Sequence, residues 1–250
     1  MPSPILTLPE ARYDEFTQWY VDLVDEMLAD PSGPWQAMLG VFEQRRQNRV
    51  ANLVVLDVAC GEGHLSRFVS QYQPKQVIGI DISRNLLAQA RRRTQLPSLE
   101  YRLDDAQTLG TLADASVDVV VSSLALMDIP HHGQLFAAMR RVLKPGGVLV
   151  FSCLHPCFEA PFHELTGPQF LNDGEERVGY IIRNYHQVGA WQSGNAGLRG
   201  HFGAHHRTLA SIVNPLTGTG FQVTHLAEPV ASGPGLFGGV PRLMVIEAQG

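Results

Sequence analysis

Cysteine is scarce in this sequence of 250 residues, which contains only Cys60, Cys153 and Cys157. Three unevenly spaced cysteines do not form the disulfide framework that holds small secreted domains together. No cationic residue adjoins Cys153 or Cys157 in the sequence, so we expect packed thiols there rather than nucleophiles. We therefore predict a reducing, cytoplasmic location.

Long apolar runs and an excess of basic charge are also missing. No stretch of about 18 apolar residues occurs, and positions 1–9 lack the basic and apolar segments of a signal peptide. The formal net charge is −5, so there is no broad basic field of the kind that attracts a phosphate backbone. We predict no membrane partner and disfavour a large nucleic acid.

The middle of the chain alternates between two apolar periods. Short β-branched runs predict strands, and stretches with helical spacing separate them, which indicates an α/β fold with a parallel sheet wrapped on both faces. The predicted strands cover 53–59, 76–81, 99–103, 117–122 and 148–153; helical spacing resumes at Leu65 and predicts further helices at 84–94 and 133–142.

The flanking segments have patterns of their own. Two helices are expected ahead of the first strand, and a segment of about 55 residues after the fifth is too long for a simple connection. The expected N-terminal helices are 13–28 and 35–47. Within the long segment we expect a strand at 178–185 and a mobile glycine-rich loop at 194–203. After the long segment we expect a helix at 208–216, bent at Pro215, and strands at 221–226 and 242–247.

A glycine motif follows the first predicted strand. Gly61 and Gly63 stand between that strand and a helix, where glycine lets the backbone approach a ligand closely. Asp81 ends the second strand about 20 residues later, the place where an acidic side chain accepts hydrogen bonds from ribose hydroxyls in nucleotide-binding folds. Together these residues predict an adenosine-type ligand.

Two residues argue against a pyrophosphate. Ser66 occupies the position where a dinucleotide fingerprint has its third glycine. Asp57, at the tip of the first strand, would repel phosphates but suits a ligand with an ammonium group. S-adenosylmethionine combines an amino-acid end, a sulfonium and an adenosine without phosphate, so it is the predicted cofactor, with S-adenosylhomocysteine as product.

Several motifs stand together in one order and spacing. They are Leu-Asp-Val-Ala-Cys-Gly-Glu-Gly at 56–63, Gly-Ile-Asp-Ile-Ser at 79–83, Asp-Asp-Ala at 104–106, Val-Val-Val-Ser-Ser-Leu-Ala-Leu at 119–126 and Leu-Lys-Pro-Gly-Gly-Val-Leu at 143–149. With them the first 153 residues resemble the class I S-adenosylmethionine-dependent methyltransferases, within the broad group similar to the ubiquinone-biosynthesis C-methyltransferases.

The resemblance implies a fold, an organisation and a reaction. The fold is a Rossmann-like, mostly parallel seven-stranded sheet whose last strand is antiparallel, with a substrate-covering insertion after the fifth strand. A single domain over 1–250 is then divided into N-terminal helices (1–50), a cofactor-binding core (51–153), the insertion (154–207) and a C-terminal helix and strands (208–250). The reaction is methyl transfer to an oxygen, a nitrogen or an activated carbon of a small molecule.

The resemblance also implies roles for single residues. The methionine end would lie against Gly61 and Gly63 with Asp57 and Ala59 nearby, and Asp81 would hold the ribose. Ile82 would pack on the adenine, Asp105 and the amide of Ala106 would bind its polar edge, Ser123 and Leu124 would form another wall, and the N-terminal tyrosine of the family is matched best by Tyr20, with Tyr13 as competitor.

Plainer alternatives exist for several of these residues. Tyr20 is also typical of the core face of an amphipathic helix, and Asp104 of a solvated turn. Gly146 and Gly147 are interpreted as a turn before a strand.

The acceptor side is predicted from position and residue type. His155 comes just after the fifth strand, at the sheet edge where ligands bind in such folds, and His206 lies near the end of the insertion, so both are candidate bases. Tyr185, Trp191 and His205 are candidate substrate contacts, and Arg183 or Arg199 would meet an anionic group. A solvated or structural histidine is the alternative in each case.

A metal site finds little support. His155, His163, His205 and His206 lack the tight ligand spacing and acidic neighbours of such a site, so we predict no metal.

Two rival functions stay open. An RNA or protein methyltransferase would need a basic groove, for which Arg91, Arg92 and Arg93 form the only obvious cluster. A protein that binds the cofactor without methyl transfer has the same motif, since fold does not fix chemistry.

Overall fold

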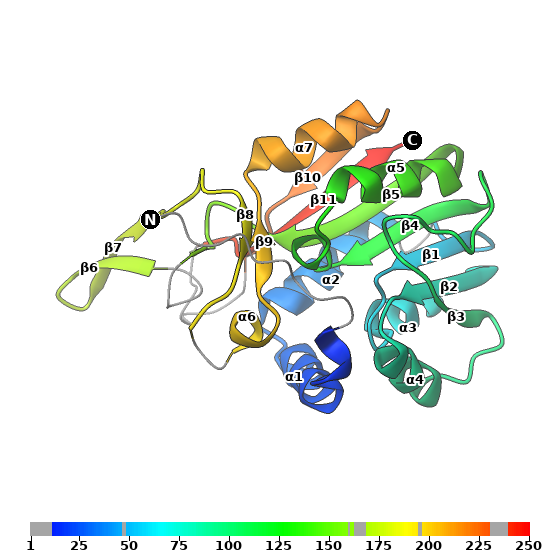
Figure 1. Ribbon diagram of the computed structural model, residues 1–250, viewed down its shortest axis with the longest axis horizontal. Helices are drawn as coiled ribbons and strands as arrows, with labels where there is room; N and C mark the ends of the chain where they lie inside the picture. The colour runs from blue at the N-terminus through cyan, green and yellow to red at the C-terminus, as the bar shows by residue number, and fades with distance from the viewer. Residues whose placement is uncertain (1–11, 47–48, 160, 163–168, 195–196, 231–239) are drawn as a thin grey trace.

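The computed structural model describes residues 12–46, 49–159, 161–162, 169–194, 197–230 and 240–250 (Figure 1). Its centre is a seven-stranded sheet in the order β10-β11-β5-β4-β1-β2-β3. All neighbours from β3 to β5 run parallel, and β11 is antiparallel to β5 and β10, which confirms the predicted fold class. The strands are β1 (Val54–Val58), β2 (Gln76–Asp81), β3 (Leu99–Leu103), β4 (Val117–Ser123), β5 (Leu143–Leu154), β10 (Gln222–Ala227) and β11 (Leu243–Gln249).

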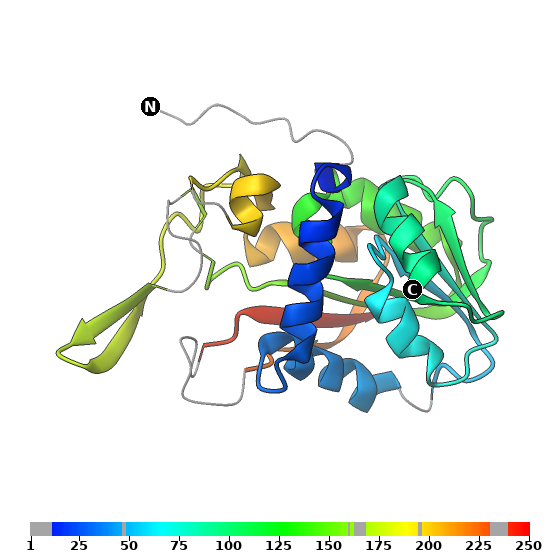
Figure 2. The same cartoon turned by 90° about the horizontal axis from the view of Figure 1, so that it is seen from below.

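Helices cover both faces of the sheet, as Figures 1 and 2 show. One face carries α2 (Pro34–Arg46), α3 (His64–Ser70) and α4 (Arg84–Arg93), and the other carries α5 (His132–Val142) and α7 (Leu209–Gly218). The helix α1 (Thr17–Ala29) lies near the end of the sheet toward which the arrows of the parallel strands point in Figure 1. The short 3₁₀ helices are η1 (Arg12–Asp14), which precedes α1, and η2 (Leu126–Asp128), which follows β4.

Covering both faces explains why the central strands are apolar throughout. Side chains alternate between the faces, so Val55 packs toward α2 and α3 while Leu56 and Val58 pack toward α5 and α7. The same alternation directs Asp57 toward α3, where it bonds to Ser66. A polar residue in such a strand is therefore held by a specific partner.

The segment after β5 contains more regular structure than expected. It forms a hairpin of β6 (Gln169–Asp173) and β7 (Glu176–Ile181), which projects from the body in Figures 1 and 2. The strands β8 (Gly189–Trp191) and β9 (Ala204–His206) pair with each other, and α6 (Leu198–His201) lies between them. The prediction of a mobile loop at 194–203 was wrong for the part described here, because Arg199 and Phe202 are buried there.

Other local predictions need smaller corrections. The expected strand at 178–185 is β7, which begins at Glu176 and ends at Ile181. Gly146 and Gly147 do not precede β5 but lie inside it, at an irregularity in its pairing with β4 between Val117 and Val119. A Cβ on Gly147 would stand 2.9 Å from the carbonyl oxygen of Lys144, so glycine is required there.

Two further features of the helices are the proline in α7 and the apolar content of the helices. Pro215 lies inside α7, whose hydrogen-bonded turns continue to Gly218. Within the described residues, no helix has both the length and the apolar content that crossing a membrane requires.

The contact between Gly79 and Tyr101 leads to a stability prediction. A Cβ added to Gly79 in β2 would lie 2.7 Å from the Tyr101 ring, whereas one added to Gly40 in α2 meets nothing within 4 Å. We expect Gly79→Ala to lower the free energy of unfolding by about 1–3 kcal/mol. Gly40→Ala should raise it by about 0.5–1 kcal/mol, because alanine favours a helix over glycine. Urea denaturation measures both, and equal stabilities would contradict the packing.

Candidate cofactor and acceptor site

The glycine turn after β1 is built from left-handed backbone. Ala59, Gly61 and Gly63 have φ angles of 55°, 56° and 84°. A Cβ on Gly61 would lie 3.9 Å from the Tyr20 ring, so the Tyr20 ring lies close to this part of the turn. A Cβ on Gly63 would lie 2.2 Å from the hydroxyl of Tyr101. Gly63 thus has a packing role that sequence reasoning missed.

Asp81 joins the turn to the next strand and helix. Its Oδ2 accepts a hydrogen bond from the Gly61 amide at 2.8 Å, and its Oδ1 accepts one from the Ser83 amide at 2.8 Å. Ser83 caps α4 by accepting from the amide of Leu86. The hydroxyl of Ser83 donates to Asp14 at 2.5 Å, which attaches η1 to the same corner.

Asp57 supplies a buried carboxylate beside the turn. It is 1% exposed, and its Oδ2 accepts a hydrogen bond from the Ser66 hydroxyl at 2.5 Å. Its Oδ1 has no hydrogen-bond partner within the described part of the chain. Burial raises the pKa of Asp57 to about 7 and that of Asp81 to about 6. An unpaired buried carboxylate oxygen fits a ligand that brings an ammonium group. The hydrogen bond to Asp57 also explains why serine stands at position 66, where a dinucleotide fingerprint has a glycine.

The predicted adenine residues lie after β2 and β3. Ile82 is 43% exposed, so its side chain is accessible to a ligand after β2. Asp105 accepts hydrogen bonds from the amide and side chain of Gln107, while Ala106 is buried. Asp104 organises its turn by accepting from Gly110 and Thr111, which favours the plainer interpretation of that residue.

Tyrosines and the end of β4 form the remaining walls. Leu124 follows β4 with a φ angle of 52°, next to Ser123 at the strand end. Tyr20 stands over Gly61, and Tyr13 contacts Tyr20 edge to face with 4.8 Å between ring centroids. Both tyrosines therefore lie near the turn, and Tyr20 is the one whose ring a side chain at position 61 would meet.

The histidines differ in which ring nitrogens are engaged. Nδ1 of His155 accepts from the Cys157 amide, and its Nε2 pairs with Glu228 at 2.6 Å, which favours a structural role over that of a base. Nε2 of His206 donates to the Tyr185 carbonyl oxygen, so Nδ1 is left as an acceptor. Burial lowers the pKa values of His205, to about 4, and His206, so both rings are neutral at pH 7.

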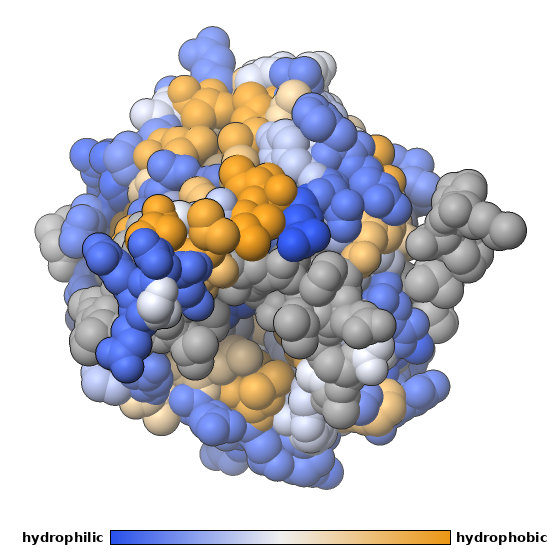
Figure 3. All heavy atoms as spheres, turned by 90° about the vertical axis from the view of Figure 1, so that its left-hand side faces the viewer, coloured by the Kyte–Doolittle hydropathy of each residue, from blue (hydrophilic) through white to orange (hydrophobic). Residues whose placement is uncertain are grey.

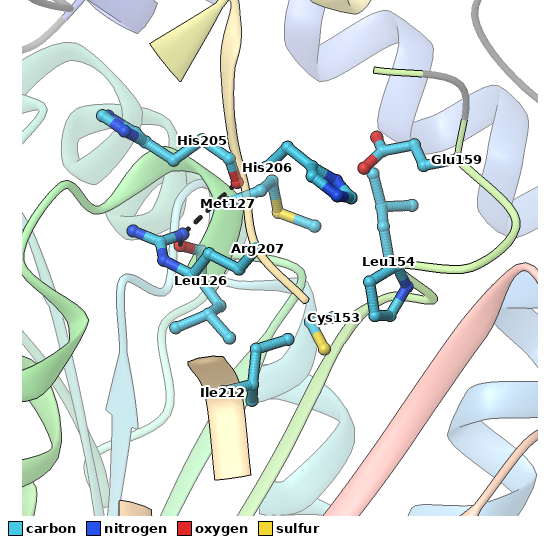
Figure 4. A pocket seen from close by; sticks show the side chains of 10 residues that line it. Leu126, Met127, Cys153, Leu154, Glu159, His205, His206, Arg207 and Ile212 are labelled. Carbon is cyan, nitrogen blue, oxygen red and sulfur yellow. Dashed lines mark hydrogen bonds between the residues drawn. The ribbon is translucent and has the colours of Figure 1, made fainter. Parts of the chain in front are cut away.

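A small cavity lies off the ends of β4 and β5 (Figure 4). Its volume of about 20 Å³ holds little more than one water molecule, so an acceptor requires the cover to rearrange. His206 and Glu159 point toward it, whereas the ring of His205 points away. The lining residues are Leu126, Met127, Cys153, Leu154, Pro156, Glu159, His205, His206, Arg207 and Ile212.

The predicted substrate contacts lie on neighbouring segments, but only one of them reaches the cavity. Tyr185 accepts a hydrogen bond from the amide of Leu209 at the start of α7, and Trp191 is 2% exposed within the main core. Neither lines the cavity, whereas His205 does.

A polar cluster that sequence reasoning missed lies beside the cavity. Asp128 accepts hydrogen bonds from Tyr13 and Arg199, each at 3.1 Å, and Arg199 Nε lies 3.9 Å from Glu159 Oε1. Burial raises the pKa values of Asp128 and Glu159. Arg199 is therefore already paired with carboxylates. Arg183, the other cation considered for an anionic group, is exposed. The position of Asp128 just after β4 was the feature of the sequence that could have indicated a functional role for this residue.

The histidines considered for a metal do not gather in the described structure. His163 lies outside the described residues, and among those described no three His, Cys, Asp or Glu side chains are grouped to hold an ion.

Comparison with known proteins identifies the family of this chain. The family model described as a methyltransferase domain matches residues 56–151. An uncharacterised protein of Haemophilus influenzae is 30% identical over 184 residues, which cover 70% of each chain. A malonyl-[acyl-carrier protein] O-methyltransferase of Xylella fastidiosa is 41% identical over 105 residues, 41% of this chain and 35% of that protein.

A solved structure extends the comparison to most of the chain. The S-adenosylmethionine-dependent methyltransferase of Mesorhizobium loti superposes with a TM-score of 0.73 at 27% identity, covering 86% of this chain and 98% of that one. The chain belongs to the class I S-adenosylmethionine-dependent methyltransferases. It is an enzyme, and S-adenosylmethionine is its cofactor.

The buried carboxylate of Asp57 leads to a pH-dependent prediction. Its pKa is about 7 in the folded protein against an ordinary value of 3.8, so the folded state holds the proton more tightly than the unfolded state. The contribution of Asp57 to stability therefore falls as the pH rises from about 4 to 7. We expect Asp57→Asn, without cofactor, to gain about 1–3 kcal/mol relative to wild type between pH 5 and pH 8, measured by denaturant unfolding.

Asp118→Asn is the matched control. Its carboxylate accepts from Val54 and Lys144, and its pKa is lowered, so Asp118 stays ionised in both states across that range. Its difference from wild type should be constant between pH 5 and pH 8. A constant difference for Asp57→Asn as well would show that Asp57 is ionised in the folded protein throughout.

Proposed function

We propose that this enzyme methylates a small molecule at an oxygen, a nitrogen or an activated carbon. The supporting observation is the small, mostly apolar cavity at the ends of β4 and β5, to which Glu159, His206 and Arg207 from the segment after β5 contribute. Exposed apolar side chains also occur on that segment, including Leu171, Val178 and Val188, and Figure 3 views this end of the molecule. Such a cover suits a small acceptor better than a long polymer.

Relatives with printed activities point the same way. Among them are a trans-aconitate 2-methyltransferase of Methylobacterium nodulans and a ubiquinone biosynthesis O-methyltransferase of Azoarcus. The chain spans 42% and 53% of their lengths, so their acceptors only support the proposed class.

The proposed cofactor position follows the walls of the turn. The methionine end lies against Ala59, Gly61 and Gly63, with its ammonium toward the unpaired oxygen of Asp57. Asp81 holds the ribose, and Tyr20 covers the centre of the cofactor. The remaining proposed contacts, toward the adenine and the end of β4, are Ile82, Asp105, Ala106, Ser123 and Leu124.

The residues of the chain would align the acceptor, exclude water and accept a proton. When bound, the cofactor supplies a methyl group activated by the sulfonium charge, and the displacement needs an in-line acceptor. His206 faces the cavity as a neutral ring with Nδ1 available, so it is the better placed of the two predicted bases. His155, with both nitrogens engaged, would position the loop after β5.

The basic cluster gives no support to a nucleic-acid acceptor. Arg91 donates to the carbonyl oxygen of Tyr101, and Arg93 pairs with Asp25 and Glu62. Two of the three arginines are therefore engaged in holding α4 to its neighbours.

Cofactor affinity tests the site. We expect Asp81→Ala to weaken S-adenosylmethionine binding at least tenfold in calorimetric titration, because it removes both the ribose acceptor and the partner of the Gly61 amide. Asp118→Ala removes a carboxylate at the opposite edge of the sheet and should bind as wild type. Wild-type affinity in folded Asp81→Ala would exclude this position for the cofactor.

Turnover tests the proposed base. Phenolic, amine and enolic compounds are screened with S-adenosylmethionine, and formation of S-adenosylhomocysteine is followed. For an acceptor that must lose a proton, His206→Gln should lower kcat about 10²-fold or more with unchanged cofactor affinity. His225→Gln, on β10, is the control. An unchanged kcat in His206→Gln would exclude His206 as the base.

A further inference from the structure

Side chains from three separate segments meet above the glycine turn. Tyr13 of η1 donates to Oδ2 of Asp128 in η2, and Arg199 of α6 donates to Oδ1 of the same carboxylate, each at 3.1 Å. The Tyr13 ring stacks on Phe202 with 3.9 Å between centroids and an angle of 13°. Asp128 is thus fixed by two hydrogen-bond donors, and one of them, Tyr13, is itself packed against Phe202.

This arrangement adjoins the proposed cofactor position. Tyr20 stands over Gly61, and the Gly61 amide bonds to Asp81. In S-adenosylmethionine the sulfonium joins the methionine part to the ribose, so its place is where Gly61 and Asp81 meet, beneath Tyr20. Tyr13 contacts Tyr20 on one side and Asp128 on the other. A continuous wall therefore leads from the turn to the Asp128 carboxylate.

The charges around this wall favour a cation. Arg67 and Arg93 pair with Glu62, and Arg199 pairs with Asp128. Asp128 raises the pKa of Tyr20 more than Arg199 lowers it, so the carboxylate is the group that acts more strongly at Tyr20. Arg199 is also shared with Glu159, which limits how far it neutralises Asp128.

We propose that Asp128 recognises the sulfonium charge and thereby distinguishes the cofactor from the uncharged thioether of the product. The two molecules have nearly the same shape and differ by one positive charge at the sulfur, so a fixed carboxylate nearby binds the cofactor more strongly. Arg199 moderates this preference. The inference rests on the proposed cofactor position and concerns binding rather than methyl transfer.

The test compares two ligands in each variant by calorimetric titration at fixed ionic strength. In Asp128→Asn the affinity for S-adenosylmethionine should fall roughly 3- to 30-fold, while that for S-adenosylhomocysteine stays near wild type. Normal binding of S-adenosylhomocysteine then shows that the variant is folded. In Arg199→Met the preference for S-adenosylmethionine should rise, because Asp128 loses its compensating charge.

Two further variants separate charge from packing. Asp128→Glu keeps the charge, so the ratio of the two affinities should stay near wild type even where both affinities fall. Glu159→Gln removes a carboxylate on the other side of Arg199 and should change the ratio less than Asp128→Asn does.

Several outcomes would overturn the inference. If Asp128→Asn weakened the binding of both ligands equally, Asp128 would be a packing residue. If it changed neither affinity, Asp128 would have no part in recognition. A shift in Glu159→Gln as large as that in Asp128→Asn would indicate a general field rather than a contact. A wild-type protein that binds neither ligand would instead contradict the proposed function.

Discussion

The hydrogen bonds of the Asp81 carboxylate are the constraint on which the site depends. One oxygen holds the turn after β1 and the other holds the chain entering α4, so a single side chain fixes two neighbouring crossovers. Ser83 then attaches Asp14, and with it the segment that carries Tyr13 and Tyr20. The glycine turn, the start of α4 and the N-terminal segment are therefore all attached to one buried carboxylate, whose pKa burial raises to about 6. Rigid elements that share one anchor keep a binding geometry more reliably than independent loops.

Electrostatic cost is concentrated in the same place. Asp57 and Asp81 are buried and have raised pKa values, and Asp57 has an oxygen without a partner among the described residues. Unpaired buried charge lowers stability unless a ligand compensates it. The surrounding sheet supplies the compensation in advance, because both faces of the central strands pack into continuous apolar clusters. Stability of the core thus allows a binding site that is unfavourable by itself.

The sequence predicted the parts of this fold that local patterns determine. The strands from 54 to 154 and the glycine turn follow from periodicity and from backbone conformations that few residues adopt. The insertion was predicted poorly because its structure depends on distant partners. Nothing local indicates that Arg199 pairs with Asp128, that Phe202 stacks on Tyr13, or that β8 and β9, of three residues each, find one another. The pairing of His155 with Glu228 could not be predicted for the same reason, since Glu228 is remote in sequence.

The stacking of Phe202 on Tyr13 couples two regions that would otherwise diverge separately. Enzymes of one fold acquire new acceptors mainly by changing loops above a constant core. Here Phe202 belongs to the segment between β5 and α7, while its partner Tyr13 belongs to the N-terminal segment and packs against Tyr20. A mutation in that segment that displaces Phe202 therefore also disturbs the packing of the two N-terminal tyrosines, so the segment is constrained by a contact outside itself.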